Sequence, residues 1–387
     1  MNEELIEFRG TQIRKSEIEY LKKLEQVIRS NFKVVEEVKR TSKYVFSVDK
    51  GQISGIGLNN CALKTLPELI SNLNGIKSLT LQLNHLTELP ESIGNLSNLK
   101  ILNLYRNNLR VLPASLRNLS SLEILNMDYN HFEEIPEVIS KIKTLKELSL
   151  NGNKLVKILS NIGNLKSLTK LFIGNNKLAN LPESIGKLKS LRVLSAENNN
   201  LTFLPESIGN LSSLKELWLT ENNLKEIPRS IGNLDSLGIL ALNENKLENL
   251  PKSIGNLPLL HELFIEYNLL TELPKAITKL KALKNLIIDN NNLICIPESI
   301  GDLIYLRKLS LNNNKLSTLP KPIGNLTSLE YLDLYNNQLT TLPESLLNLK
   351  KLKELSIAKN PLIKKRDSTT SYIIQALIDK GKNVILY

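Results

Sequence analysis

The chain has 387 residues, of which 41% are hydrophobic and 23% are charged, a composition typical of globular proteins and not of disordered or membrane-embedded chains. It has no apolar run near the roughly 18 residues of a membrane span, and its two cysteines are too few for a disulfide framework or a four-cysteine zinc site. The net charge of +11 does not indicate a nucleic-acid surface along the whole chain, because residues 350–387 contribute +6 of it, from nine Lys/Arg against three Asp/Glu.

Residues 1–52 precede the periodic part of the chain, and we expect them to form an N-terminal cap of a helix plus a hairpin strand. The first ten residues carry four charges and no apolar core, so we expect no secretory signal and a cytoplasmic protein. Ser16 and Glu19 form a capping-box pattern, which predicts an amphipathic helix of about four turns. Residues 44–48 and 52–54 flank a glycine-containing turn, which predicts a β-hairpin.

From residue 53 to residue 362, the pattern L-x-x-L-x-L-x-x-N-x-L recurs every 23 residues. The L-x-L core alternates with period two, which predicts a short strand with its leucines inward and the other residues outward. One repeat buries too little apolar surface to offset its ordering entropy, so the repeats must stack. An asparagine turned inward at each bend can satisfy buried backbone groups, and stacked asparagines form a ladder. The ladder positions are Asn84, Asn107, Asn130, Asn153, Asn176, Asn199, Asn222, Asn245, Asn268, Asn291, Asn314, Asn337 and Asn360, with Cys61 one period earlier.

A proline lies six residues after most ladder asparagines, and the sequence usually continues as P-E-S-I-G-N-L. Proline suits the first turn of a short helix, because it lacks the donor that has no partner there. The glycine ten residues after the asparagine is expected to end or tighten that turn. In one repeat, residues 158–161 replace the L-P-E-S segment, and we expect a looser turn there.

With these motifs the chain resembles the leucine-rich-repeat family. The L-P-x-S-I-G-x-L segment is similar to the 23-residue intracellular subclass found in Ras-scaffold proteins and plant Ras-group-related proteins. The resemblance covers residues 53–362 as fourteen repeats of 23 residues. It implies an α/β repeat solenoid, a horseshoe with a parallel β-sheet on its concave side and short helices or turns on its convex side.

Residues 363–387 are basic, and we expect them to form a C-terminal cap of a helix and a strand. Asp367 can cap a helix that ends near Gly381. Residues 384–386 are the expected last strand. The apolar residues of the predicted helix are Tyr372, Ile373, Ala376 and Leu377.

Motifs for catalysis are missing from the sequence. There is no G-x-x-x-x-G-K-[ST] phosphate loop, since Gly186-Lys187 is followed by a leucine. His85 and His131 follow ladder asparagines, and we interpret them as exposed loop residues. Cys295 shares its repeat with no histidine that could act as its base, so we interpret it as a plain thiol. We therefore expect no enzyme, no cofactor and no metal site.

The outward strand positions should form columns along the concave sheet. In the middle column, large and small residues alternate from Phe172 through Trp218 to Phe264, and the small residues leave sockets for anchor side chains. The column three residues earlier is basic and includes Arg192 and Lys215. The two columns on the other side are largely acidic, and Tyr267 adds aromatic character there. The acidic residues beside the aromatic run are Glu197, Glu221, Glu244 and Glu266.

Protein interfaces concentrate binding energy in buried aromatic residues, with charges at the rim that steer and select the partner. The columns therefore predict a protein-binding groove whose hot spot is Phe172, Trp218 and Phe264. In the alternative interpretation, the rings stiffen the sheet by packing on one another and the charges only solvate it. Bases could also stack on these rings, but the acidic column would repel phosphates, so we do not expect nucleic acid as the partner.

The predicted function is that of a non-catalytic, monomeric scaffold or adaptor that binds a protein on the concave face. The family resemblance implies signalling assemblies, with a Ras-like small GTPase or another signalling protein as the partner class. A regulatory subunit that inhibits an enzyme by covering its active site stays open, as does a purely structural repeat. Nucleic-acid or anionic-surface binding through the basic C-terminal segment also stays open. Its residues are Lys350, Lys351, Lys353, Lys364, Lys365 and Arg366.

Overall fold

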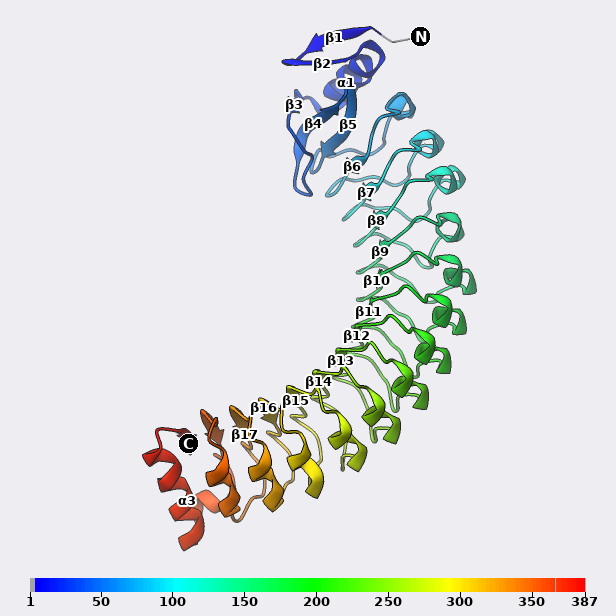
Figure 1. Ribbon diagram of the computed structural model, residues 1–387. Coiled ribbons are helices and arrows are strands. Elements are labelled where there is room, and N and C mark those ends of the chain that lie inside the picture. The colour runs from blue at the N-terminus through cyan, green and yellow to red at the C-terminus, as the bar shows by residue number, and fades with distance from the viewer. Residues whose placement is uncertain (1–3, 366, 387) are drawn as a thin grey trace. The chain divides into compact units, whose positions relative to one another are not determined.

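A computed structural model describes residues 4–365 and 367–386. The chain divides into two compact units, residues 1–178 and residues 179–387, and each is described by itself below (Figure 1). Both are built from stacked repeats, each with one short strand and one 3-10 turn. The predicted fold class, a leucine-rich-repeat solenoid with a parallel sheet, is confirmed.

The N-terminal unit begins with a hairpin of β1 (Leu5–Phe8) and β2 (Thr11–Arg14), which the sequence analysis missed, followed by α1 (Lys15–Ile28). The predicted capping box is wrong. Strand β2 runs directly into α1, so Arg14 is the N-cap residue and Ser16 lies inside the first turn. The hairpin supplies a partner for a first-turn donor, because the Lys15 N–H donates to the Glu4 carbonyl at 3.3 Å.

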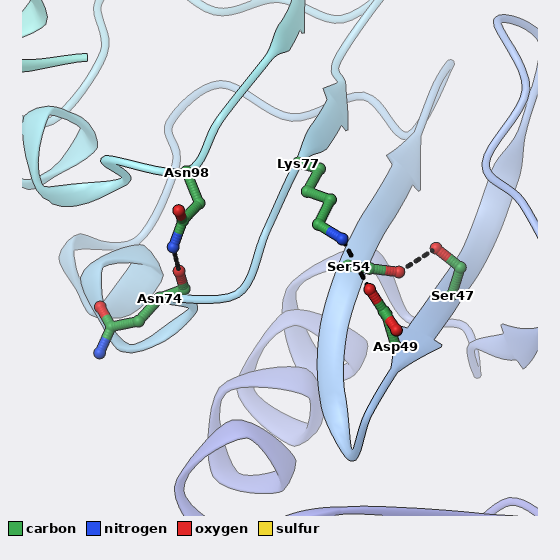
Figure 2. Close-up of polar contacts among 6 residues, drawn as sticks. All are labelled: Ser47, Asp49, Ser54, Asn74, Lys77 and Asn98. Carbon is green, nitrogen blue, oxygen red and sulfur yellow. Dashed lines mark hydrogen bonds and ion pairs between the residues drawn. The ribbon is translucent and has the colours of Figure 1, made fainter. Parts of the chain in front are cut away.

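Three strands connect α1 to the repeats: β3 (Lys33–Val34), β4 (Lys43–Asp49) and β5 (Gln52–Leu58). Strand β4 pairs antiparallel with β5, and β5 pairs parallel with β6, the strand of the next repeat. Figure 2 shows the contacts at this junction. The Lys77 amino group lies 2.6 Å from the Asp49 carboxylate, and the Ser47 and Ser54 hydroxyls are 2.9 Å apart. The Asn98 side chain of the following repeat donates to the Asn74 carbonyl at 2.8 Å.

The repeats of the N-terminal unit form a parallel sheet in register. At residues 158–161, where a looser turn is expected, Ser160–Asn164 forms a five-residue 3-10 turn like that of the other repeats, with Ile162 buried. The strands are β6 (Ser78–Thr80), β7 (Ile101–Asn103), β8 (Ile124–Asn126), β9 (Glu147–Ser149) and β10 (Lys170–Phe172). The 3-10 turns are η1 (Glu68–Asn72), η2 (Glu91–Asn95), η3 (Ala114–Asn118), η4 (Glu137–Lys141) and η5 (Ser160–Asn164).

The C-terminal unit continues the same repeat, with strands on one side and 3-10 turns on the other (Figure 1). The strands are β11 (Val193–Ser195), β12 (Glu216–Trp218), β13 (Ile239–Ala241), β14 (Glu262–Phe264), β15 (Asn285–Ile287), β16 (Lys308–Ser310), β17 (Tyr331–Asp333) and β18 (Glu354–Ser356). The 3-10 turns are η6 (Glu183–Lys187), η7 (Glu206–Asn210), η8 (Arg229–Asn233), η9 (Lys252–Asn256), η10 (Lys275–Lys279), η11 (Glu298–Asp302), η12 (Lys321–Asn325) and η13 (Glu344–Asn348).

The end of this unit has two helices, α2 (Pro361–Lys364) and α3 (Ser368–Asp379), and a last strand, β19 (Asn383–Ile385), that pairs parallel with β18. The predicted cap of α3 is confirmed, because the Asp367 carboxylate accepts from the Thr370 N–H at 2.6 Å. The placement of Tyr372 on the apolar face is wrong. This side chain is exposed, and Ile374 is buried with Ile373 and Leu377 instead.

The predicted asparagine ladder is confirmed inside both units. At Asn222, the side-chain amide donates to the carbonyls of Leu219 and Ala196, each at 3.0 Å, and its oxygen accepts from the Leu201 N–H at 3.0 Å. The same three bonds recur at Asn245 and at the later ladder positions of this unit. Each ladder asparagine therefore ties its own bend to the preceding repeat, which fixes the register of the strands.

The roles predicted for proline and glycine need correction. Each proline is the residue before the 3-10 turn and not part of its first turn, as at Pro228 ahead of η8. The glycine does not end the turn by a left-handed conformation. Gly232 lies inside η8, where a Cβ atom would clash with the carbonyl oxygen of Ser253 in the next repeat. Glycine is required there because neighbouring turns approach too closely for any side chain.

Candidate interaction face

The side chains of β11–β18 that point away from the leucine core form one face of the C-terminal unit, called the strand face below. Its middle column is set by parallel register, with Ser195 opposite Trp218, Ala241 between Trp218 and Phe264, and Phe264 opposite Ile287. Trp218 and Phe264 are half-buried, whereas Ala241 is only 1% exposed. The alternation of large and small residues therefore places an aromatic residue on each side of the buried Ala241.

The rings of Trp218 and Phe264 do not pack on each other; no ring contact within the described residues joins them. The Trp218 indole N–H instead donates to the Glu216 carboxylate two residues earlier, at 3.1 Å, which fixes the orientation of the ring. The interpretation in which these aromatic residues stiffen the sheet by mutual contact therefore does not apply to this pair. Their apolar faces are available to another molecule.

The residue before each ladder asparagine has a positive φ, a conformation that favours Gly and Asn over other residues. In the C-terminal unit, asparagine is the most frequent residue there, in four of eight repeats, as at Asn198 (φ 49°) and Asn290 (φ 55°). Three consecutive repeats beside the aromatic pair do not. Their residues are Glu221 (φ 55°), Glu244 (φ 53°) and Tyr267 (φ 54°).

These three side chains are exposed, Tyr267 to 58%, and within the described part of the chain no ion pair or ring contact engages them. The last repeat has Lys359 at this position, with its amino group 5.1 Å from the centre of the Tyr335 ring. Charge and aromaticity identify these three residues in the sequence, but they do not predict the backbone strain. Comparison of the repeats with one another would have shown asparagine as the preferred residue.

In the N-terminal unit, two consecutive repeats also have residues other than asparagine at this position, and contacts of their side chains offset the backbone strain. Arg106 (φ 52°) and Tyr129 (φ 53°) occupy the same position, and the rings of Tyr105 and Tyr129 are 5.4 Å apart in an edge-to-face arrangement. The Arg106 guanidinium lies 5.4 Å and 5.2 Å from the centres of these two rings. These cation–π and ring contacts offset the strain. Within the C-terminal unit, strain without such internal compensation thus distinguishes Glu221, Glu244 and Tyr267.

The acidic edge of the strand face is crowded and half-buried. Burial raises the pKa of Glu197, Glu266 and Asp289 above the usual carboxylate range, and neighbouring carboxylates raise it further. One carboxylate oxygen of Glu266 is buried without a hydrogen-bond partner. Lys308 offsets part of this repulsion at Glu266 and Asp289, but no ion pair within the described residues involves these carboxylates, and a cationic group of a partner would stabilise them.

On the basic side of the strand face, Arg192 and Lys215 are exposed, and no ion pair involves either within the described residues. Some other members of this column are neutralised, since Lys353 pairs with Glu330 and, in the N-terminal unit, Lys77 pairs with Asp49. Only part of the predicted basic column is thus available to a partner.

Nine of the ten predicted site residues lie in the C-terminal unit, on or beside the strand face. The tenth, Phe172, ends β10 in the N-terminal unit, where it is half-buried opposite Ser149. The structure therefore brings together Trp218, Phe264, Tyr267 and the charged residues around them.

The basic C-terminal segment is partly used inside the fold. Besides the Lys353–Glu330 pair, the Lys382 amino group donates to the Lys350 carbonyl at 2.9 Å. Lys364 and Lys365 are exposed, and Arg366 lies outside the described residues.

Among the described residues, no cluster of three or more His, Cys, Asp or Glu side chains could hold a metal ion. Burial raises the pKa of the Cys61 thiol to about 11, which keeps it protonated, and Cys295 is exposed. No helix of the described chain is long and apolar enough to cross a membrane.

A family model described as a leucine-rich repeat region matches residues 56–175, 137–227, 208–295 and 288–366. A leucine-rich-repeat protein of Leptospira interrogans is 35% identical over 94% of this chain and 91% of its own, with a TM-score of 0.80. The plant peptide hormone receptor RGFR1, solved in complex with RGF2, is 31% identical over 80% of this chain and 55% of its own, with a TM-score of 0.63. The ectodomain of the receptor kinase GASSHO1/SCHENGEN3 from Arabidopsis thaliana is 27% identical over 81% of this chain and 46% of its own, with a TM-score of 0.56.

No curated protein matches the chain. The leucine-rich-repeat fold commonly mediates protein–protein interaction, and proteins with it are typically binding scaffolds without enzymatic activity. Because the matched segments extend through residues 56–366, the chain belongs to the leucine-rich-repeat family.

Proposed function

We propose that the C-terminal unit binds a protein partner on its strand face, with Trp218 and Phe264 as anchors and Tyr267 beside them. The observation that carries this proposal is the run of three strained, exposed residues, Glu221, Glu244 and Tyr267, next to the aromatic pair. Asparagine in other repeats meets the same backbone requirement at lower cost. Strain without local compensation is typical of functional sites, where a side chain is kept for an external contact.

Trp218 and Phe264 lie on either side of the buried Ala241, and an apolar side chain of the partner would contact both rings. A buried aromatic anchor of this kind contributes about 2 kcal/mol or more to binding when its surroundings exclude water. The half-buried acidic edge favours a partner with cationic groups, because such groups would pair with carboxylates that form no ion pair within the described residues. The preferred partner therefore has an apolar side chain flanked by lysine or arginine.

The chain would act as a scaffold or adaptor without catalysis of its own. A Ras-like small GTPase is the first partner class to test, and the cytoplasm the first compartment, on the basis of the subclass that the L-P-x-S-I-G-x-L segment resembles. An extended peptide segment is the second candidate, favoured by the similarity to RGFR1, which was solved in complex with RGF2. Both partner classes would use the same anchors.

Affinity capture with paired variants tests the proposal. The wild-type chain and the Trp218→Ala/Phe264→Ala variant would be used as baits in a lysate of the source organism, with captured proteins identified by mass spectrometry. A matched control changes two exposed residues of the 3-10 turns, Lys252→Ala/Lys275→Ala. We expect a protein that the wild type and the control retain and the anchor variant loses. Equal recovery by all three baits, each folded by circular dichroism, would contradict the proposal.

A further inference from the structure

A second surface of the C-terminal unit lies on the flank of the repeats, ahead of strands β14–β18. There a groove of about 460 Å³ runs across successive repeats. Its position is distinct from the middle column of the strand face, because its lining residues precede the strands in each repeat. The residues that line it and are used below are Leu259, Lys284, Tyr305, Arg307, Glu330 and Lys351.

The apolar floor of this groove departs from the pattern of the repeat itself. The position five residues before the middle column is serine at Ser190, Ser213 and Ser236, and small polar residues also occupy it in the N-terminal unit. In the three repeats that follow Ser236, it is Leu259, alanine and Tyr305. Leu259 is 56% exposed and Tyr305 is 60% exposed. Apolar side chains thus replace serine where they remain in contact with water.

The rim of the groove is basic and mostly without counter-charges. Within the described residues, no ion pair or hydrogen bond of the side chain engages Lys284, Arg307 or Lys351. The carboxylate of Glu330 is already hydrogen-bonded to Lys353, which holds its pKa below the usual range. The groove therefore presents three available cations around an exposed apolar floor.

We propose that this groove binds an acidic segment of a protein partner that carries an apolar anchor side chain. The charge complementarity comes from Lys284, Arg307 and Lys351, and the anchor would cover Leu259 and Tyr305. A small anion or a nucleic-acid backbone would satisfy the cations but would leave the apolar floor in water. An acidic peptide with one large apolar residue satisfies both features, and this chemistry differs from the cationic partner favoured by the strand face.

Fluorescence anisotropy of two synthetic peptides with the full chain tests this proposal. One fluorescein-labelled peptide consists of Asp and Glu with a single central Phe, and the other has Gly in place of that Phe. We expect the Phe peptide to bind at least about tenfold more tightly than the Gly peptide, because only its anchor covers the apolar floor. Its affinity should fall as salt concentration rises, since the rim charges are exposed.

The variants use the repeat as its own control. Tyr305→Ser introduces the residue that is most frequent at this position of the repeat, so it should fold as the wild type does while it weakens binding of the Phe peptide about tenfold. Lys284→Glu/Arg307→Glu should weaken binding about 30-fold or more, because two attractive charges become repulsive. The charge-matched variant Lys252→Glu/Lys275→Glu, in the 3-10 turns η9 and η10, should bind the Phe peptide as the wild type does.

Three results would overturn the proposal. The wild type could fail to bind the Phe peptide, or it could bind the Phe and Gly peptides equally. A third result would be that inorganic polyphosphate or a single-stranded oligonucleotide of equal charge binds as tightly as the Phe peptide. Its binding would then be weakened by Lys284→Glu/Arg307→Glu but not by Tyr305→Ser. The last result would identify a site for anions alone. Because Tyr305 lies outside the strand face, these outcomes are independent of the capture experiment described above.

Discussion

The strained residues beside the aromatic pair make a prediction in which stability and binding change in opposite directions. The variant Glu221→Asn/Glu244→Asn/Tyr267→Asn places asparagine at three left-handed positions where other repeats already have it. A residue other than Gly, Asn or Asp in this conformation costs roughly 1–2 kcal/mol. Asparagine recovers part of that cost, so each substitution should stabilise the unit by about 0.5–1 kcal/mol.

Summed over the three substitutions, the free energy of unfolding should rise by about 1.5–3 kcal/mol. The rise is smaller if the effects of substitutions in neighbouring repeats are coupled. Chemical denaturation followed by tryptophan fluorescence is a direct assay, because Trp218 is the only tryptophan of the chain and reports on this unit. The denaturation midpoint should rise. Capture of the strand-face partner should fall, because the variant removes two rim carboxylates and one aromatic ring from the site.

The control variant Glu221→Gln/Glu244→Gln removes the same charges without the backbone preference of asparagine. Its denaturation midpoint should rise less than that of the corresponding Asn pair, since only charge repulsion is relieved. A lower midpoint for the asparagine variant would refute the strain argument, because the native side chains would then be stabilising the fold. A higher midpoint with unchanged partner capture would refute the assignment of these residues to the site.

Three further predictions concern the fold and its acidic edge. Glu266→Gln should stabilise the chain by about 1 kcal/mol at neutral pH, because it removes a carboxylate with a buried oxygen that has no hydrogen-bond partner. The pKa of Glu266 is raised in the folded state, so the wild type gains stability relative to this variant as pH falls. Denaturation at neutral and at acidic pH should therefore show that the difference in stability between the two proteins shrinks. Gly232→Ala should cost about 1–3 kcal/mol, since its Cβ would clash with the Ser253 carbonyl oxygen, and an unchanged midpoint would contradict this close approach. Asn268→Ala should cost at least about 2 kcal/mol by leaving buried carbonyls and an N–H without partners, which thermal unfolding would measure.

The repeat made the periodic part of the fold predictable from the sequence. The spacing of the ladder asparagines and the L-x-L core determine strand position, register and ladder geometry, and hydrogen bonds such as those of Asn222 match that expectation. The cap of α3 could also be predicted, because Asp367 lies directly before the helix in the sequence. Features that depend only on neighbours in sequence, or on neighbours one period away, could therefore be inferred.

Features that depend on packing outside the repeat could not be inferred from the sequence. Ser16 matches a capping box, but an unpredicted hairpin supplies the partner for a first-turn donor of α1 and makes Arg14 the N-cap. The close approach that requires Gly232 is a property of neighbouring turns in three dimensions. In the candidate site, the aromatic and charged residues followed from their columns, but the strain at Tyr267 appeared only with the backbone angles.

The most direct test of the strand-face proposal is fluorine NMR of the chain labelled with 5-fluorotryptophan. Because Trp218 is the only tryptophan, the labelled chain gives one resonance, and an unlabelled partner obtained by capture adds none. We predict that this resonance shifts and loses its solvent-isotope effect as the partner is added to saturation, since the ring becomes covered. An unchanged resonance with a saturating partner would contradict the proposal that Trp218 anchors the complex.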